Sequence, residues 1–340
     1  MTVVAGTDPR DFMKDLPQSR SGRLLHNELG RRWPADPDHL ATIVRYALLP
    51  AGKLLRPIMT LESAEAVGGH PDSVLPAALS MEYIHVATLV HDDIIDADEL
   101  RRGRPAVPVA FGTPAAIVAG DQLIFTAFAS LTECHAAGVP ADRVVAATDA
   151  LATAGADLCR GQLLESQLVD DPDSGVAAYL EVARLKTGAL FRAVCQVGAL
   201  LGGADATRAG QLANYGEQLG IAFQIRDDLL AYEASTATIG KPTTSDLANG
   251  RPTLPVLLAY ETSPPATRAE LTSALHRHST DPATHRRVHD ILRATRALER
   301  AREQAGDHAR QARDQLHTLP DSASRDVLTA IARWATAQSR

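Results

Sequence analysis

Residues 82–96 read EYIHVATLVHDDIID, a largely apolar run that ends in three carboxylates. No helix breaker interrupts the run, so it predicts one continuous helix. Asp92 and Asp96 are four positions apart, which places them one turn apart on one helical face, where like charges repel. A solvated acidic helix end is the ordinary alternative, but this run is too apolar for a surface helix. We therefore expect Mg²⁺ between these carboxylates and the phosphates of a substrate.

A second stretch repeats this design. Residues 220–230 read GIAFQIRDDLL, in which Asp227 and Asp228 again end an apolar helical run. The repetition predicts two walls of one site. Two such clusters indicate a Mg²⁺-dependent enzyme that binds a diphosphate ester.

Basic residues accompany the acidic clusters. Lys53 and Arg56 follow Pro50, so we expect them near a helix start and three apart on one face, where backbone N–H groups attract phosphate. Two ordinary surface charges are the alternative for this motif alone. Lys186 lies in an apolar helical stretch, where a buried ammonium needs an anionic or polar partner. Arg101 follows the first acidic cluster closely.

The composition favours an all-α fold. Of the 340 residues, 45% are hydrophobic but only 4% are aromatic, so the core must be built from Ala, Leu and Val, which suit close helix packing. Helix-period segments recur from residue 24 onward, and alternating strand patterns are missing. The formal net charge of −7 argues against nucleic-acid binding, which normally needs a basic footprint.

The chain is expected to form one helical domain over residues 21–340, preceded by a mobile polar arm over residues 1–20. The N-terminus lacks a continuous apolar segment, and no stretch approaches the ~20 apolar residues that span a bilayer. We therefore expect a cytoplasmic protein without a transmembrane segment. The histidines of the polar C-terminal helices are expected to be solvated: His276, His278, His285, His289 and His308.

Taken together, these segments resemble the trans-isoprenyl diphosphate synthase (polyprenyl synthetase) family over residues 24–330. Each motif alone is weak, but their order along the chain is specific. The order is Gly-Lys-x-x-Arg-Pro from Gly52, Asp-Asp-x-x-Asp from Asp92 with Arg101-Arg102-Gly103, Gly120-Asp121, Lys186-Thr187, Phe-Gln-x-x-Asp-Asp from Phe223, and Gly240-Lys241-Pro242 with Ser245-Asp246-Leu247.

The resemblance implies an antiparallel helical bundle around a deep central cavity, the isoprenoid synthase fold, usually as a homodimer. The two acidic clusters would face each other across the cavity mouth. Mg²⁺ ions would bridge Asp92, Asp96 and Asp227 to the diphosphate of an allylic substrate, while Asp93 and Asp228 act through water. Metal bound there would neutralise the leaving pyrophosphate, which lowers the barrier to ionisation.

The same resemblance implies condensation of isopentenyl diphosphate with dimethylallyl, geranyl, farnesyl or geranylgeranyl diphosphate. Thr187 and Gln224 would line the path of the allylic cation, because their oxygens stabilise positive charge. The residues implied for isopentenyl diphosphate are Lys53, Arg56, His85 and Arg102. Those implied for the allylic diphosphate are Arg101, Lys186 and Lys241.

One position departs from the family pattern. The second cluster normally carries another Asp one helical turn after Asp227, but here that position is Ala231. Asp227, the expected direct ligand, is present. We therefore expect that the groups around one metal, beyond its direct ligands, are less well organised and that activity is retained.

Product length in this family depends on the residues about one turn before the first acidic cluster. Ala87 and Thr88 occupy these positions, where short-chain relatives often place Phe or Tyr. Small side chains leave the cavity floor open. The expected product is a medium or long trans-polyprenyl diphosphate.

Two alternative functions remain open. A class I terpene cyclase on the same fold would consume one allylic diphosphate, but it has no need for the second diphosphate site of Lys53, Arg56 and His85. A non-catalytic subunit of a heteromeric synthase is favoured by Ala231. The complete first acidic cluster and Lys186 argue against that reading.

Overall fold

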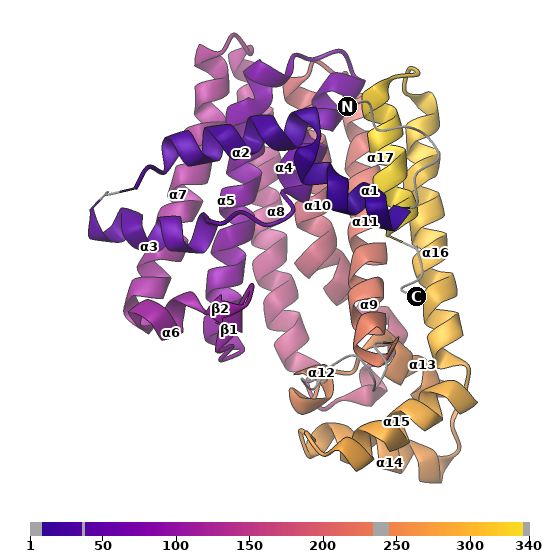
Figure 1. Cartoon of the computed structure of the whole chain (residues 1–340). Helices are drawn as coiled ribbons and strands as arrows, with labels where there is room; N and C mark the ends of the chain where they lie inside the picture. Colours follow the sequence, from indigo (N-terminus) through magenta and orange to yellow (C-terminus); the bar gives the residue numbers. More distant parts are fainter. Residues whose placement is uncertain (1–8, 36–37, 234–244, 336–340) are drawn as a thin grey trace. The chain divides into compact units, whose positions relative to one another are not determined.

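The computed structural model describes residues 9–35, 38–233 and 245–335, and these are predominantly helical (Figure 1). The described residues contain one hairpin of two short antiparallel strands, β1 (Leu100–Arg101) and β2 (Arg104–Pro105). The predicted all-α class is confirmed. The chain groups into two compact units, named unit 1 and unit 2.

Unit 1 comprises residues 1–152, 193–213 and 317–331. Its long helices are α5 (Pro71–Ile95), α7 (Thr113–Ala136) and the first part of α8 (Ala141–Gln167). Its short helices are α1 (Pro9–Asp15), η1 (Leu16–Gln18), α2 (Arg20–Arg32), α3 (His39–Leu48), α4 (Leu55–Ala66) and α6 (Val107–Phe111). Parts of four further helices complete it: α10 (Ala189–Leu201), α11 (Ala206–Glu233), η4 (Leu316–Thr318) and α17 (Ala323–Trp334).

Unit 2 comprises residues 153–192, 214–316 and 332–340. The second part of α8 and most of α11 belong to it. A π-helical turn, η3 (Ala183–Gly188), joins α9 (Gly175–Val182) directly to α10. The remaining helices are η2 (Pro172–Ser174), α12 (Ser245–Ala248), α13 (Leu254–Thr262), α14 (Pro265–His276), α15 (Pro282–Ala294) and α16 (Ala297–Gln315).

Helix α5 forms the centre of unit 1. It begins at Pro71, where the missing N–H of proline sacrifices no helical hydrogen bond. Side chains around most of its circumference are buried, including Tyr83, Val86 and Val90, and both α4 and α7 pack against it. A helix that is apolar all round is stable only inside a core. This packing holds in place the carboxylates at the C-terminal end of α5.

Two helices of unit 1 are long and apolar enough, by length and composition, to cross a membrane. They are α5, with 25 residues, and α7, with 24 residues. The expectation that no stretch reaches this limit is wrong for both. In α5, 72% of the apolar window is buried inside the fold, as in the core helix of a globular protein, whereas in α7 the buried share is 39%.

The segment expected to be a mobile arm contains the helices α1 and η1. Phe12, Met13 and Leu16 are buried there, and Leu16 has no exposed surface. Ser19 then caps α2, because its hydroxyl accepts a hydrogen bond from the Gly22 N–H at 3.1 Å. Apolar residues three and four positions apart share one helical face, so even this polar segment presents a small apolar contact surface. Its described part belongs to the packed fold.

The core of unit 2 surrounds α13. Leu254, Leu257 and Leu258 of this helix are fully buried, within a cluster that also draws on α9, α11, α14, α15 and α16. Helix α13 is preceded by a short loop after α12. Because α13 is fixed in the core, the residues of that loop are held close to it.

Candidate active site

The first acidic cluster lies at the C-terminal end of α5. Asp92 and Asp96 are partly exposed, and the Asp96 N–H donates to the Asp92 carbonyl oxygen at 2.8 Å, so helical geometry continues to Asp96. The C-terminal end of a helix carries partial negative charge, which makes carboxylates there unfavourable. A cation would relieve that repulsion and the repulsion between the two carboxylates. The geometry therefore suits a divalent cation.

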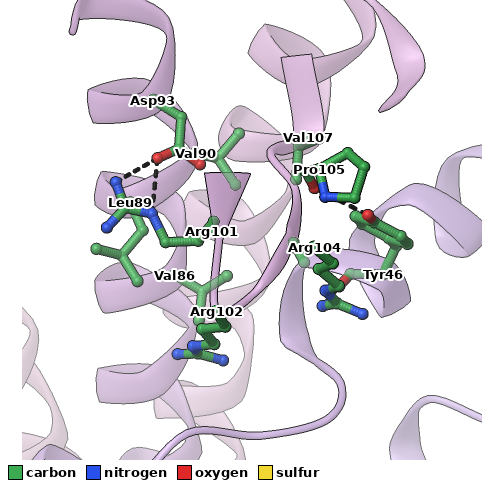
Figure 2. A pocket seen from close by; sticks show the side chains of 11 residues that line it. Tyr46, Val86, Leu89, Val90, Asp93, Arg101, Arg102, Arg104, Pro105 and Val107 are labelled. Atoms are coloured by element: carbon green, nitrogen blue, oxygen red, sulfur yellow. Dashed lines mark hydrogen bonds and ion pairs between the residues drawn. The ribbon is translucent and has the colours of Figure 1, made fainter. Parts of the chain in front are cut away.

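The remaining carboxylate of this cluster, Asp93, is paired within unit 1. Its side chain is 2% exposed, and the Arg101 guanidinium reaches it from the hairpin, with Nε 2.7 Å from Oδ1 (Figure 2). Arg101 also lies 2.7 Å from Asp98. Burial raises the pKa of Asp93, and the guanidinium opposes that shift. Arg101, which the motifs associate with the allylic diphosphate, holds Asp93 in this structure.

The tight turn between β1 and β2 directs Arg102 away from the first acidic cluster. The two residues between the strands have φ of 52° and 76°, and a two-residue hairpin turn with left-handed residues matches the strand twist. Tyr46 of α3 anchors the hairpin, because its hydroxyl donates to the Pro105 carbonyl oxygen at 2.8 Å and its ring lies 4.1 Å from the Arg104 guanidinium. Arg102 consequently points away from Asp93 (Figure 2).

Arg56 and His85 contact each other in unit 1. Arg56 Nη1 lies 3.2 Å from His85 Nε2. Desolvation, followed by the charge of Arg56, holds the pKa of His85 well below its ordinary value. Neutral His85 can therefore accept a hydrogen bond from Arg56 and align the guanidinium without cancelling its charge.

Arg102 lies over the segment that precedes α4. A Cβ at Gly52 would be 2.9 Å from Arg102 Nη2, so the absence of a side chain makes room for the guanidinium. Arg102 Nη1 also donates to the Pro50 carbonyl oxygen at 3.4 Å. Lys53, the next residue after Gly52, is exposed. Arg102 and Lys53 thus belong to one basic region of unit 1.

The expected placement of Lys53 and Arg56 on one helical face is wrong. Leu54 has φ of 53°, and α4 begins only at Leu55. Because a left-handed residue does not continue into a right-handed helix, Lys53 lies in the non-helical segment before α4. Arg56 lies in the first helical turn, where backbone N–H groups favour an anion, as predicted.

Glu82 is a residue of this region that the motifs did not reveal. It lies three positions before His85 on α5 and is 2% exposed. Burial raises the pKa of Glu82, whereas the charges of Arg102 and Arg56 lower it. Its signal in the sequence is a carboxylate inside an apolar run, because such a group needs a basic or polar partner.

The second acidic cluster contains a hydrogen-bonded network in unit 2. Buried Asp228 accepts hydrogen bonds from the Tyr179 hydroxyl at 2.6 Å and from Gln224 Nε2 at 2.9 Å. Gln224 Oε1 in turn accepts a hydrogen bond from Thr187 Oγ1 at 2.7 Å. Burial and the charge of Asp246 raise the pKa of Asp228. The structure thus joins Thr187, Gln224 and Asp228, and it adds Tyr179, which no motif indicated.

Lys186 occupies the π-helical turn η3. Its Nζ is 2.6 Å from Glu165 Oε2, and this carboxylate supplies one of the two kinds of partner, anionic or polar, that the sequence predicted. Arg251 Nη2 lies 3.7 Å from the same oxygen. Isolated π-helical turns are rare and frequently occur at functional sites. The sequence motifs assigned no role to Glu165 or Arg251. Their proximity is evident only from the folded structure.

These groups line one pocket of unit 2. It combines two basic side chains with three carboxylates and an apolar wall, a mixture suited to an ester with an anionic head and an apolar tail. Lys241, which the motifs associate with the allylic diphosphate, lies outside the described residues. The pocket is lined by Glu165, Leu168, Ser174, Tyr179, Val182, Ala183, Lys186, Thr187, Gln224, Asp228, Asp246, Arg251, Pro252, Thr253 and Leu257.

Asp227 and Ala231 occupy the last turns of α11. The helix continues unbroken to Glu233, so Ala231 lies one turn beyond Asp227, where the motif expects another carboxylate. Asp227 itself is exposed. The side chain at 231 is a methyl group and offers no ligand at this position.

The carboxylates fit a metal that is shared with a substrate. Within the three described ranges, no group of three His, Cys, Asp or Glu side chains forms a ready-made metal cage. Mg²⁺ is usually bound by one or two carboxylates together with substrate phosphates and water. Asp92 with Asp96, and Asp227, supply such carboxylates near the ends of two helices.

The residues expected at the product-length floor lie on α5. Ala87 is 1% exposed, whereas Thr88 is partly exposed. The Thr88 hydroxyl donates to the His85 carbonyl oxygen at 2.8 Å, which occupies it within its own helix. Neither side chain projects the bulk of an aromatic ring.

Comparisons with known proteins agree with these motifs. The sequence model of the polyprenyl synthetase family matches residues 37–292. The short chain isoprenyl diphosphate synthase of Methanothermobacter thermautotrophicus is 36% identical over 296 residues, which cover 87% of this chain and 89% of that protein. The octaprenyl diphosphate synthase of Escherichia coli is 32% identical over 299 residues, which cover 87% of this chain and 88% of that protein.

A solved structure is also similar along nearly the whole chain. The polyprenyl synthase from Caulobacter crescentus, in complex with calcium and isoprenyl diphosphate, is 30% identical and has a TM-score of 0.86. The match covers 98% of this chain and 99% of that one. The resemblance predicted from the motifs is confirmed. The chain belongs to the polyprenyl synthetase family and is an enzyme of the prenyl diphosphate synthase class.

Proposed function

We propose that this enzyme is a Mg²⁺-dependent prenyltransferase that condenses isopentenyl diphosphate with an allylic diphosphate. The observation that carries this proposal is a set of basic residues in each unit: Arg56 and Arg102 in unit 1, and Lys186 and Arg251 in unit 2. An enzyme that ionises a single diphosphate needs only one anion site. Two sets of cations support a reaction between two diphosphate esters.

The unit 2 pocket binds the allylic substrate in this proposal. Lys186, Arg251 and Lys241 bind its diphosphate. The allylic C–O bond breaks, and its electron pair leaves with pyrophosphate. Thr187 uses its O–H in the 2.7 Å bond to Gln224, so the lone pairs of its hydroxyl oxygen remain to stabilise the carbocation. The same bond fixes the direction of the Gln224 amide.

The basic residues of unit 1 bind the isopentenyl diphosphate. Lys53, Arg56 and Arg102 hold its diphosphate, and neutral His85 keeps the Arg56 guanidinium aligned. The double bond of the bound substrate attacks the allylic cation and forms the new C–C bond. Loss of a proton to the released pyrophosphate then restores a double bond. These residues act by binding and orientation.

Asp92, Asp96 and Asp227 hold Mg²⁺ in this proposal, with Asp93 and Asp228 acting through water. Bound metal supplies charge neutralisation of the departing pyrophosphate. The similar Caulobacter crescentus polyprenyl synthase is in complex with both calcium and isoprenyl diphosphate, which supports a requirement for a divalent cation. Removal of divalent ions with EDTA should abolish activity, and Mg²⁺ should restore it.

We propose a medium or long product because Ala87 and Thr88 are small. The Ala87→Phe variant should shorten the product, since a ring there would occupy the path of the growing chain. Ala87→Ser changes the volume little and should leave the product length unchanged. Mass spectrometry of the products distinguishes the variants, and an unchanged chain length in Ala87→Phe would remove the floor assignment.

We further propose that the enzyme is a cytoplasmic homodimer formed through α7. Ile117, Val118 and Phe125 on this helix are 45%, 51% and 72% exposed, and exposed apolar patches of this kind are typical of subunit interfaces. A second copy of the chain would cover them. Light scattering should show a dimer for the parent and a shift toward monomer for Phe125→Glu. A monomeric parent would contradict the proposal.

The main test is a direct assay. The purified protein is incubated with Mg²⁺, isopentenyl diphosphate and each of the four allylic primers, and product masses and pyrophosphate release are measured. We expect elongated products and one pyrophosphate for each C–C bond formed.

Consumption of an allylic diphosphate without elongation would indicate a terpene cyclase, and absence of any elongated product would overturn the main proposal.

One observation favours a second candidate, a non-catalytic subunit of a heteromeric synthase. Ala231 leaves the second cluster without a carboxylate one turn after Asp227. A silent subunit would give no product alone with any primer and would raise the activity of a partner synthase when the two are mixed. Turnover by the isolated chain excludes this candidate.

A further inference from the structure

Three residues in left-handed conformation meet at one place in unit 2. Asp170, Gly250 and His278 have φ of 63°, 66° and 46°. Asp170 follows α8, Gly250 follows α12, and His278 follows α14. Left-handed backbone is unfavourable for residues other than glycine, so it persists where surrounding contacts impose it.

Hydrogen bonds join these segments around Asp170. Its N–H donates to the Gly250 carbonyl oxygen at 2.9 Å. The ring of His278 places Nε2 3.0 Å from Asp170 Oδ2, and His276 places Nε2 2.9 Å from the Asp170 carbonyl oxygen. Two histidines expected to be solvated are therefore bound to one residue. The backbone and the side chain of Asp170 are both held.

Gly250 fits closely against this group. A Cβ at position 250 would lie 2.2 Å from Asp170 Oδ1 and 3.1 Å from His278 Nε2. The site therefore needs glycine for its close approach as well as for its φ. No side chain could be added here without moving Asp170 or the loop.

The contact with Gly250 holds the segment of residues 246–251, which carries two lining residues of the pocket, Asp246 in α12 and Arg251 in the loop after it. The Gly250 N–H donates to the Leu247 carbonyl oxygen at 3.1 Å, and the Arg251 N–H donates to the Asp246 carbonyl oxygen at 2.8 Å. Asp246 and Arg251 line the pocket together with Lys186. A shift of Gly250 would be passed to both side chains through these bonds.

We propose that Asp170 is a positioning residue that, together with His278, holds the 246–251 segment so that Arg251 meets the diphosphate of the substrate. An arginine binds a diphosphate well only when its guanidinium is held in the correct orientation before the ligand arrives. Asp170 does not line the pocket, so it acts through Gly250. The inference depends on the proposed function only for the identity of the ligand.

The test uses the full chain and titrates it calorimetrically with inorganic pyrophosphate in the presence of Mg²⁺. Asp170→Ala loses the bond to His278 and disfavours the left-handed backbone, and we expect pyrophosphate binding to weaken roughly five- to tenfold. Asp170→Asn tolerates left-handed backbone and keeps an acceptor oxygen for a His278 N–H. We expect it to remain within about twofold of the parent.

A matched control uses another histidine of the same region. His285 Nε2 lies 2.6 Å from the Ser279 carbonyl oxygen, and within the part of the chain that the structure describes His285 makes no hydrogen bond to Asp170 or Gly250. His285→Ala should lower the unfolding midpoint without changing pyrophosphate binding. His278→Ala, at a residue whose side chain is 47% exposed, provides a second variant should Asp170→Ala fail to fold.

Steady-state kinetics gives a second readout, in which Asp170→Ala and His278→Ala should raise the KM for the allylic diphosphate and leave kcat nearly unchanged. Pyrophosphate binding equal to the parent in both variants would overturn the proposal, as would equal weakening in His285→Ala. A parent that binds pyrophosphate through this loop but condenses no substrate would contradict the proposed function and leave the positioning role intact.

Discussion

The two acidic clusters hold their buried carboxylates in different ways. Asp93, near the end of α5, is paired with the Arg101 guanidinium. Asp228, near the end of α11, accepts hydrogen bonds from the neutral donors Tyr179 and Gln224. The same Asp-Asp pair in the sequence therefore gives one ionic site and one neutral hydrogen-bonded site.

The difference has an energetic consequence. A buried carboxylate that loses its counter-ion keeps an uncompensated charge, whereas one that loses a neutral donor keeps its other hydrogen bonds. Both clusters retain a more exposed carboxylate, Asp92 or Asp227, beside the buried one. Each cluster thus combines a more exposed carboxylate with a buried one whose hydrogen bonds fix the local structure.

The largest effect is expected for the carboxylates proposed to hold Mg²⁺. Asp96→Asn should lower kcat/KM by about three orders of magnitude, or ~4 kcal/mol in the transition state, because a neutral amide is a poor Mg²⁺ ligand. Steady-state kinetics at saturating Mg²⁺ measures this loss. Asp72→Asn, at the exposed start of the same helix, is the control and should behave as the parent. A loss below tenfold in Asp96→Asn would show that the first cluster does not carry the metal.

The ionic pair is expected to contribute more to stability than the neutral bonds. Arg101→Gln should lower the free energy of unfolding by about 2–3 kcal/mol, less than for a fully buried pair because the Arg101 side chain is 36% exposed. Urea denaturation measures the change. Arg287→Gln removes an exposed ion pair with Glu270 and should have no measurable effect. Equal effects in the two variants would break the comparison.

The neutral bond should contribute less. Tyr179→Phe removes the donor to Asp228 Oδ2, while the bond from Gln224 to Oδ1 remains. We expect a loss of about 1–2 kcal/mol in the free energy of unfolding. Tyr260→Phe removes an exposed bond of 2.9 Å to Asp173 and serves as the control, with no measurable loss expected. A loss in Tyr179→Phe larger than in Arg101→Gln would reverse the assignment of the two clusters.

The smallest effect is expected at the position where the second cluster is incomplete. Ala231→Asp restores a carboxylate one turn after Asp227 and should raise kcat/KM by about three- to fivefold, through better organisation of the water around one metal. Ala231→Asn, similar in size but uncharged, is the control. If both variants match the parent, the missing carboxylate has no effect on activity, and the expected effect on the organisation of water around one metal is contradicted.

The sequence was sufficient for the fold class and the family. Apolar runs without breakers predicted the long helices, and four-residue spacing predicted the common face of Asp92 and Asp96. Such features depend on local periodicity, which a single sequence displays directly. A partner for Lys186, either anionic or polar, was also predicted, although its identity as Glu165 was not.

Contacts between distant segments could not be predicted in this way. Tyr179 and Asp228 are 49 positions apart, and His278 and Asp170 are 108 positions apart. Neither pair has a spacing that signals proximity. The wrong placement of Lys53 on a helical face has a different origin. Leu54 adopts a left-handed conformation, but leucine is not one of the residue types that indicate a turn, so the sequence did not show that the helix begins only after it.

The π-helical turn η3 has a consequence for how Lys186 and the buried face of α10 are oriented. A π turn arises when one extra residue is accommodated in a helix, so it shifts the angular register of everything before it relative to everything after it. Phe191 on α10 is fully buried, whereas Lys186 faces the pocket. The π turn lets these two requirements be met at once, because it sets an angular offset between the lysine and the buried face that an uninterrupted α-helix would not give.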